Sequence, residues 1–296
     1  MSGSGAGDGG GRATGGAGVP GGVGGSGAVG LDALGDLSFE GAAVVLGPDG
    51  VRASTGDLGR QRAWRSVTKT LTGYATGIAL ERGAVTLEDP VGPEGSTLRH
   101  VLAHASGLFY ESDNVLKAPG ARRCYSNRGI DLAGEHVGAV LGRDFGDWVA
   151  DEVLDPLGMD GVRWTGSPSV GAFGRLEDLA RFAAELLRPT LVGPEVFAEL
   201  TSVQFPDLVG VMPGFGQQRP NPFGLGFEVR GEKSPHWTGS RNSPRTFGHF
   251  GMLGTAFWID PVADLALVVG TSHDFCDEHR DVLPRLSDAV LAAHAD

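Results

Sequence analysis

Cysteine and long apolar stretches are scarce in this sequence. Only two of its 296 residues are cysteines, Cys124 and Cys276, so no disulfide framework is predicted and a reducing, cytoplasmic compartment is expected. No stretch of about 18 apolar residues is present, which predicts that no helix spans a membrane. The N-terminus has no basic segment followed by an apolar one, so we expect no secretory signal. The motif Gly-x-Ser-x-Gly is also absent, which disfavours the nucleophile elbow of α/β-hydrolases.

Positive charge is scarce as well, and lysine above all. The chain has 24 Lys+Arg against 36 Asp+Glu, a formal net charge of −12. An acidic surface repels phosphate backbones and anionic lipid, so neither nucleic acid nor a membrane is an expected partner. Only Lys69, Lys117 and Lys233 are lysines. Because lysine can lose its proton in a protein and arginine cannot, a lysine beside a serine is a candidate base.

Residues 1–30 differ from the rest of the chain. Glycine occupies half of these positions, and such a segment cannot bury enough apolar surface to offset the entropy of ordering it. We therefore expect a disordered glycine-rich tail over 1–30. The remaining residues, 31–296, are long enough for one folded domain that carries an insertion.

Patterns of apolar and turn residues predict strands at both ends of the domain and helices in its middle. A β-hairpin is predicted at 41–46 and 51–54, and a helix over 64–83 with Gly83 as its stop. Further helices are predicted at 98–105, 130–141, 145–157, 175–187, 194–200 and 280–294. Strands are predicted at 223–229, 246–250, 255–259 and 265–270. This order indicates a sheet domain with a helical insertion at about 97–205.

Ser66-Val67-Thr68-Lys69 places a hydroxyl and an amine three residues apart on the predicted helix. Positions i and i+3 share a face, so the amine of Lys69 can reach the hydroxyl of Ser66. A serine needs a base to become a nucleophile, and a desolvated lysine can act as one. Ser66 is therefore a candidate nucleophile, although such a pair also arises by chance.

Two further segments carry candidate site residues. Tyr125 offers a phenol for proton transfer, and Asn127 offers an amide that could orient partners or simply cap the helix that follows. In the segment 247–255, Gly251 permits close backbone approach, and N–H groups there could complete an oxyanion hole with that of Ser66. His249 lies in the same segment, where a histidine is more often structural than catalytic.

Together these three motifs resemble the serine β-lactamase and penicillin-binding protein superfamily, which includes the class C β-lactamases and the family VIII esterases. The flanks resemble that group too, at 99–108, 119–127, 131–134, 155–159 and 248–261. The resemblance covers about residues 40–295. It implies an α+β fold, an antiparallel sheet flanked by helices with a helical insertion, and no cofactor.

The resemblance also implies an acyl-enzyme mechanism. Ser66 would attack a carbonyl, Lys69 and Tyr125 would carry protons, and Asn127 would orient Lys69 and the substrate. The N–H groups of Ser66 and Met252 would bind the oxyanion. The expected function is hydrolysis of small esters or amides; acyl transfer by the same fold, or a non-catalytic binding relative, are the alternatives.

One departure from the group narrows the expected substrate. In β-lactamases and peptidases the third motif is typically Lys-Thr/Ser-Gly, whereas this chain has His249-Phe250-Gly251. Phenylalanine cannot donate a hydrogen bond, and a neutral histidine is a weaker partner for an anion. We therefore expect poor recognition of β-lactams and of D-Ala-D-Ala.

Weaker signals remain. His273 and His279 flank residues of metal-ligand type, but an acidic first turn of the last helix explains them better, and no metal site is predicted. His104 is expected to belong to a structural turn. Surface loops are the preferred interpretation for a last set of candidate pocket-rim residues: Asp113, Lys117, His236, Trp237 and Arg241.

Overall fold

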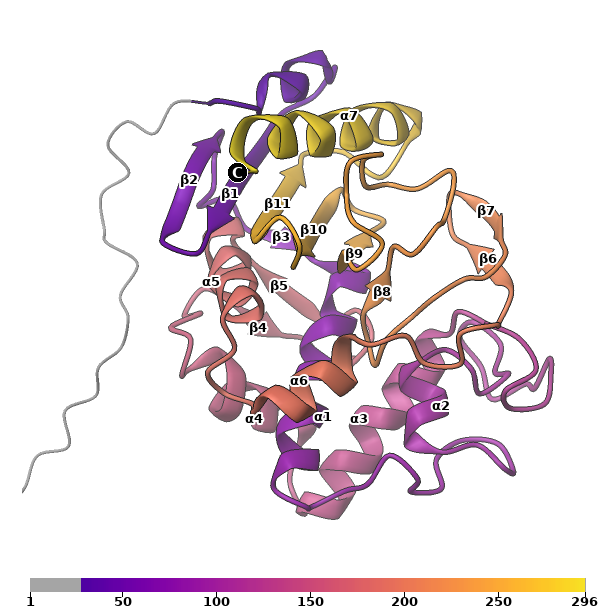
Figure 1. Ribbon diagram of the computed structural model, residues 1–296. Coiled ribbons are helices and arrows are strands. Elements are labelled where there is room, and N and C mark those ends of the chain that lie inside the picture. Colours follow the sequence, from indigo (N-terminus) through magenta and orange to yellow (C-terminus); the bar gives the residue numbers. More distant parts are fainter. Residues whose placement is uncertain (1–27, 296) are drawn as a thin grey trace, which may run out of the picture.

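The two ends of the domain meet in one six-stranded antiparallel sheet (Figure 1). The computed structural model describes residues 28–295. The strand order is β2-β1-β11-β10-β9-β8. The bounds are β1 Gly41–Gly47, β2 Gly50–Thr55, β8 Glu228–Val229, β9 Phe247–Gly251, β10 Thr255–Asp260 and β11 Leu265–Thr271. Strands β1 and β11 pair from Gly41 with Thr271 to Leu46 with Ala266.

Both faces of the sheet are buried, and alternate residues of each central strand face opposite sides. Val45 and Leu267 pack with Leu286 of the last helix, α7 (Asp277–His294). Val44 and Val268 belong to a second core, on the opposite face of the sheet. Complete burial of such a side chain contributes about 1.5–3 kcal/mol. Helix α7 lies along one face of the sheet, together with the 3-10 turn η1 (Asp32–Asp36) (Figure 1).

The opposite face is covered by helices from the middle of the chain. Their bounds are α1 Thr68–Glu81, α2 Leu98–Leu102, α3 Asn127–Leu141, α4 Phe145–Val149, α5 Leu176–Leu187 and α6 Pro194–Thr201. Helix α5 packs against β1 and β11, whereas α1 contacts α3, α4 and α6. Nearly every residue of α1 is buried, so this helix is central between the sheet and the other helices. The predicted insertion at 97–205 thus includes α5, a helix that covers the sheet.

Most predicted elements are present, with shifted ends. The hairpin β1–β2 is confirmed, and α1 stops before Gly83, which has a φ of +68°. The helix predicted from residue 64 is wrong at its start, since the 3-10 turn η2 (Arg65–Val67) precedes α1. The helix predicted at 145–157 divides into α4 and a π-helical turn, η3 (Ala150–Leu154).

The strand predicted at 223–229 is wrong over most of its length, because only Glu228 and Val229 join the sheet. The preceding residues cross α1 instead. A Cβ atom at Gly73 would lie 2.2 Å from the carbonyl oxygen of Leu225, and one at Gly226 would lie 2.6 Å from that of Lys69. This close backbone packing prevents 224–226 from continuing the strand.

Short strands were missed by the sequence patterns. They are β3 Arg62–Ala63, β4 Arg163–Trp164, β5 Ala172–Gly174, β6 Gly210–Met212 and β7 Gly216–Gln218. The first three form a small sheet and the last two a hairpin. The predicted tail falls outside the described residues from 1 to 27.

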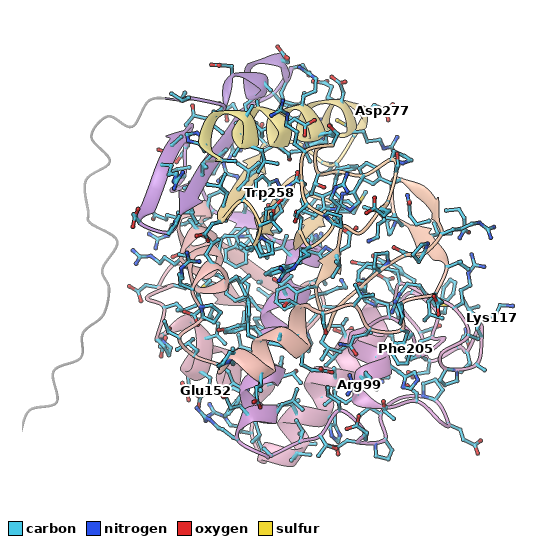
Figure 2. The ribbon with its side chains drawn as sticks, in the orientation of Figure 1. Arg99, Lys117, Glu152, Phe205, Trp258 and Asp277 are labelled. Atoms are coloured by element: carbon cyan, nitrogen blue, oxygen red, sulfur yellow. The ribbon has the colours of Figure 1, made fainter. Side chains whose placement is uncertain are left out.

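The side chains divide into interior and surface sets (Figure 2). Trp258 is buried between the sheet and α7 and donates to Ser287 Oγ (2.9 Å). Lys117 and Asp277 lie at the periphery. Within residues 28–295, every helix is too short or too polar to traverse a lipid bilayer.

Candidate active site

Ser66 lies in the η2 turn, where β9 comes close to the start of α1. The preceding residue, Arg65, has a φ of +49°, in the left-handed region that costs a non-glycine residue about 1 kcal/mol or more. A Cβ atom at Gly251 would lie 2.4 Å from the carbonyl oxygen of Trp64. Glycine at 251 therefore allows the end of β9 to touch the backbone next to Ser66.

Lys69 is completely buried one turn further along. Its Nζ donates to Ser66 Oγ (3.2 Å) and to the carbonyl oxygen of Ser169 (3.0 Å). Burial lowers its pKa from 10.5 to about 7, against the opposing effect of Asp131 and Glu111. A substantial fraction of Lys69 is therefore an unprotonated amine at neutral pH, beside the hydroxyl that it would have to deprotonate.

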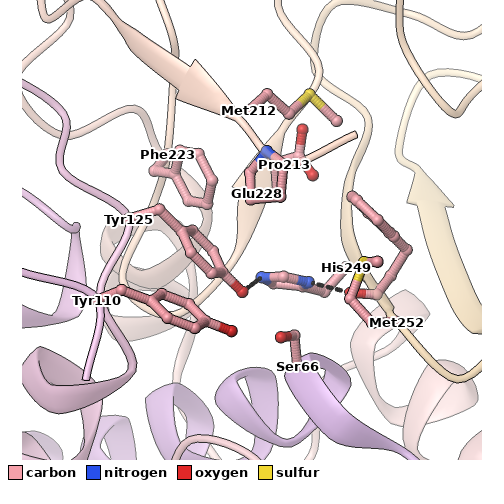
Figure 3. Close-up of a pocket in the computed structure, with 10 residues that line it drawn as sticks. Ser66, Tyr110, Tyr125, Met212, Pro213, Phe223, Glu228, His249 and Met252 are labelled. Atoms are coloured by element: carbon pink, nitrogen blue, oxygen red, sulfur yellow. Dashed lines mark hydrogen bonds between the residues drawn. The ribbon is translucent and has the colours of Figure 1, made fainter. Parts of the chain in front are cut away.

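Tyr125 approaches the same place from the loop before α3. Its ring centroid is 5.1 Å from Lys69 Nζ, and its hydroxyl is 3.4 Å from Nε2 of His249 (Figure 3). Burial raises the pKa of the phenol well above its ordinary value, and a hydrogen bond with the Ser66 side chain opposes part of that rise. The phenol therefore keeps its proton at neutral pH.

The hydrogen bonds of His249 define which ring nitrogen carries the proton. Nδ1 is 2.8 Å from the carbonyl oxygen of Phe250, which can only accept, so Nδ1 must hold the hydrogen. Burial, assisted by Lys69, lowers the pKa of His249 to about 4, so the ring is neutral at pH 7. Its Nε2 is then an acceptor, and the hydroxyl of Tyr125 donates to it.

Asn127 is the first residue of α3 but does not cap it. Ser126 is the N-cap, because its Oγ accepts from the N–H of Gly129 (3.0 Å). The interpretation of Asn127 as the cap is therefore wrong. Asn127 is predicted to orient Lys69 and the substrate. Its Nδ2 is 3.4 Å from Glu111 Oε1, and its Oδ1 is buried without a hydrogen-bond partner.

Met252 lies in the turn after β9, beside Ser66 in the pocket wall (Figure 3). The turn is closed by the N–H of Gly254, which donates to the carbonyl oxygen of Gly251 (3.1 Å). The Met252 carbonyl oxygen accepts from the N–H of Phe275 (3.0 Å). The second bond uses the carbonyl of Met252 and not its N–H, which is compatible with the predicted role of that N–H as an oxyanion donor.

A cavity of about 250 Å³ opens above Ser66. Its walls are mostly aromatic and apolar. The lining residues are Ser66, Tyr110, Tyr125, Met212, Pro213, Phe223, Glu228, His249, Phe250 and Met252. The missed hairpin β6–β7 contributes Met212. This surface suits an uncharged, apolar group bound next to the serine.

Glu228 is the one carboxylate of this wall, and its charge is fully compensated. Its Oε1 accepts from Lys233 Nζ and His236 Nε2 (2.8 Å each), and its Oε2 accepts from Trp237 Nε1 (2.8 Å). Burial alone would raise the pKa of Glu228, but Lys233 and His236 outweigh it and lower that pKa below its ordinary value. Burial lowers the pKa of Lys233 to about 8. The ammonium group of Lys233 is thus engaged by Glu228.

The candidate pocket-rim residues fall into an exposed set and a buried set. Asp113, Lys117 and Arg241 are exposed, as expected of surface loops. The same expectation is wrong for His236 and Trp237, which are buried around Glu228. Sequence patterns missed Glu228 altogether; the only signal was Lys233, one of three lysines in the chain.

Two further histidines, His104 and His279, belong to the framework. His104 is buried with a φ of +55°; its Nδ1 accepts from the N–H of Ser126 (3.2 Å), and its ring lies 4.4 Å from that of Tyr125. His279 is hydrogen-bonded to Thr271 and Cys276. Between residues 28 and 295, no three His, Cys, Asp or Glu side chains gather as metal ligands.

Comparison with known proteins agrees with this architecture. The family model described as Beta-lactamase matches residues 38–291. The chain belongs to the Beta-lactamase family. Among curated proteins, none matches this sequence.

Solved structures resemble this chain at two levels of similarity. A crystal structure described as a beta-lactamase from Mycobacterium bovis is 50% identical, with a TM-score of 0.88, over 90% of this chain and all of that one. EstCE1, a hydrolase with promiscuous acyltransferase activity, is 18% identical with a TM-score of 0.70, over 88% and 96% of the two chains. A D-stereospecific amidohydrolase from Streptomyces sp. is 17% identical with a TM-score of 0.65, over 86% and 96%. The last two share the fold.

Proposed function

We propose that this chain is a serine hydrolase that cleaves small esters or amides through an acyl-Ser66 intermediate. Family membership supports hydrolase-type activity in general. The observation that carries the specific proposal is the contact between Lys69 Nζ and Ser66 Oγ (3.2 Å), with the amine buried and its pKa lowered to about 7. A neutral amine at that distance is a suitable base for a serine hydroxyl.

The proposed cycle balances its protons within the site. Lys69 takes the Ser66 proton as Oγ attacks the carbonyl carbon, and the N–H groups of Ser66 and Met252 stabilise the oxyanion. The carbon–leaving-group bond then breaks, and the leaving oxygen or nitrogen receives the proton from Lys69 by way of Tyr125. In the second half, Lys69 takes a proton from water, the resulting hydroxide attacks the acyl carbon, and Ser66 recovers its proton.

The hydrogen bond of His249 supports one assignment of the base. Its Nε2 accepts from the phenol and therefore favours the protonated form of Tyr125. A lysine in that position would donate to the phenolate and favour the opposite form. We therefore assign proton abstraction to Lys69, and proton delivery to Tyr125.

The cavity favours neutral substrates with an apolar acyl group. Its single carboxylate is paired, and His249 is neutral, so a substrate carboxylate would find no unpaired cation among the lining residues. Although the relative from Mycobacterium bovis is described as a beta-lactamase, we propose that β-lactams are poor substrates here. Acyl transfer from Ser66 to an alcohol or amine is the second candidate, favoured by the description of EstCE1 as promiscuous in this way.

The test measures turnover of p-nitrophenyl butyrate and of a chromogenic cephalosporin, together with intact-protein mass. Wild type is expected to hydrolyse the ester and to show an acyl adduct. Ser66→Ala should lose at least about 1,000-fold in kcat/KM, because the nucleophile is absent. An alcohol added to the reaction distinguishes acyl transfer from hydrolysis, because transfer yields a new ester and hydrolysis yields the free acid.

Matched lysine variants supply the control. Lys69→Arg keeps the charge but loses the base, so turnover should collapse, whereas Lys117→Arg at an exposed site should match wild type. Full activity in Ser66→Ala would refute the acyl-Ser66 proposal. Faster turnover of the cephalosporin than of the ester would refute the proposed substrate class.

A further inference from the structure

One face of α1 holds the segment that accepts the second hydrogen bond of Lys69. Three side chains of α1 bind this segment, which runs from residue 167 to 172. Lys69 Nζ donates to the carbonyl oxygen of Ser169 (3.0 Å) and Thr72 Oγ1 to that of Pro168 (2.6 Å), and Thr68 Oγ1 accepts from the N–H of Ala172 (3.1 Å). The position of the Lys69 amine therefore depends on the position of this segment.

The opposite side of the segment is held by α3 through a single carboxylate. Asp131 Oδ1 accepts from the N–H of Ser169 (2.9 Å) and from Ser167 Oγ (2.9 Å). Ser169 is itself buried, with 1% of its surface exposed. A continuous chain of hydrogen bonds thus runs from Asp131 through Ser169 to Lys69 and on to Ser66.

Asp131 also acts on Lys69 through its charge. Two carboxylates oppose the loss of the Lys69 proton, Asp131 of α3 and Glu111 of the preceding loop, and Asp131 has the larger effect. Asp131 borders a surface groove of about 560 Å³, which gives its carboxylate access to solvent. The other titratable groups around Lys69 are His104, Tyr125 and His249, which burial holds in their neutral forms.

We propose that Asp131 is a positioning residue that holds the Lys69 amine against Ser66 through the backbone of Ser169. This inference rests on the proposed role of Lys69 as the base. Two contributions follow from the geometry, and they are separable. One is mechanical, because the carboxylate fixes the carbonyl that orients the amine. The other is electrostatic, because its negative charge favours the ammonium form of Lys69.

Substitutions at 131 distinguish the two contributions. Asp131→Asn keeps an oxygen that can accept from Ser169 and Ser167 but removes the charge, so the pKa of Lys69 should fall by about half to one unit. The acidic limb of kcat/KM should move to lower pH by the same amount. Asp131→Ala loses the anchor as well, and kcat should fall about 10- to 100-fold at every pH. Ser167→Ala keeps the charge and is the matched control.

The scarcity of lysine allows a direct measurement on the full-length chain. With ¹³Cε-labelled lysine, NMR should give three signals, from Lys69, Lys117 and Lys233. Lys117→Arg and Lys69→Arg assign them by the signal that each removes. The midpoint of the Lys69 titration should be lower in Asp131→Asn than in wild type and Ser167→Ala. This readout does not require turnover, so it remains decisive if no ester is hydrolysed.

Three results would overturn the inference. An unchanged Lys69 midpoint in Asp131→Asn would show that the charge does not reach the amine. Wild-type kcat in Asp131→Ala would show that the anchor is dispensable. The Asp131 variants could also lose activity and Tm without a shift of the Lys69 midpoint or of the acidic limb of kcat/KM. That result would show a purely structural role for Asp131 and would contradict the proposal.

Discussion

At the scale of single residues, burial of the Lys69 amine lowers the free energy of unfolding. A pKa lowered from 10.5 to about 7 corresponds to about 4–5 kcal/mol of preference for the neutral amine. The unfolded chain, with the higher pKa, binds more protons between pH 7 and 10.5. Stability should therefore rise with pH across this window, and below about pH 7 the full cost of burying the amine is present.

Replacing the amine by an apolar group of similar length should stabilise the fold. Lys69→Met leaves the Ser169 carbonyl unpaired, which costs about 1–3 kcal/mol, less than the burial cost that it removes. We expect a higher Tm at pH 6, by about 2–4 °C for each kcal/mol gained, and a flatter dependence of stability on pH above 7. Thermal unfolding followed by circular dichroism measures both. A Tm below that of wild type would contradict this estimate of the burial cost.

Only part of the candidate site could be predicted from the sequence, because most of its contacts join residues that are far apart along the chain. Ser66 and Lys69 are neighbours on one helical face, so their contact could be predicted from spacing. Tyr125 and His249 lie 124 residues apart, and it was the resemblance to a family that brought them together. Asp131 and Ser169 have no spacing signal, because a backbone carbonyl makes the contact with Lys69.

At the scale of elements, Arg123 connects the segment before Tyr125 to three others. It is completely buried, and its guanidinium donates to the carbonyl oxygens of Ala103, Gln204 (2.6 Å) and Asn221 (2.9 Å). Burial lowers its pKa to about 10. The planar fork of donors satisfies several carbonyls from one point, which an ammonium cannot do in the same geometry.

Arg123→Lys should therefore be destabilising, although the charge is kept. Loss of two such bonds costs about 3 kcal/mol or more, and the loop that carries Tyr125 should shift. We expect a Tm lower by about 6–12 °C and reduced ester turnover. The half-buried neighbour Arg122 gives the control: its one side-chain hydrogen bond is to Gln217 Oε1 (2.9 Å), so Arg122→Lys should change Tm and turnover far less. Equal Tm values for the two variants would argue against a bridging role for Arg123.

Elements defined by local patterns could be predicted, and those defined by distant partners could not. The hairpin β1–β2 and the helices α3, α5 and α6 follow from residue periodicity and turn residues. The strands β3 to β7 have only two or three residues each, too few to show a period. Strand β3 pairs with the distant β5, whereas β4 pairs with β5 and β6 with β7 over short separations, in strands too short for a pattern to mark.

At the scale of the whole molecule, the N-terminal boundary can be tested by truncation. The family match begins at residue 38, and Leu31 and Leu34 pack in the core beneath α7. Removal of residues 1–27 should leave Tm and kcat/KM unchanged. Removal of residues 1–36 should lower the Tm, because burial of each of these leucines contributes about 1.5–3 kcal/mol. A loss of activity in the shorter truncation would assign a function to the glycine-rich segment.

The pairing of β1 with β11 also bears on how the molecule is made. These strands join residues 41–46 to 266–271, so during synthesis the first strand leaves the ribosome long before its central neighbour exists. Ser66 emerges early and His249 late, so the proposed catalytic groups cannot assemble until β9 has been translated. We therefore expect the nascent chain to carry an exposed apolar hairpin through most of translation, and its folding to benefit from chaperones that bind such strands.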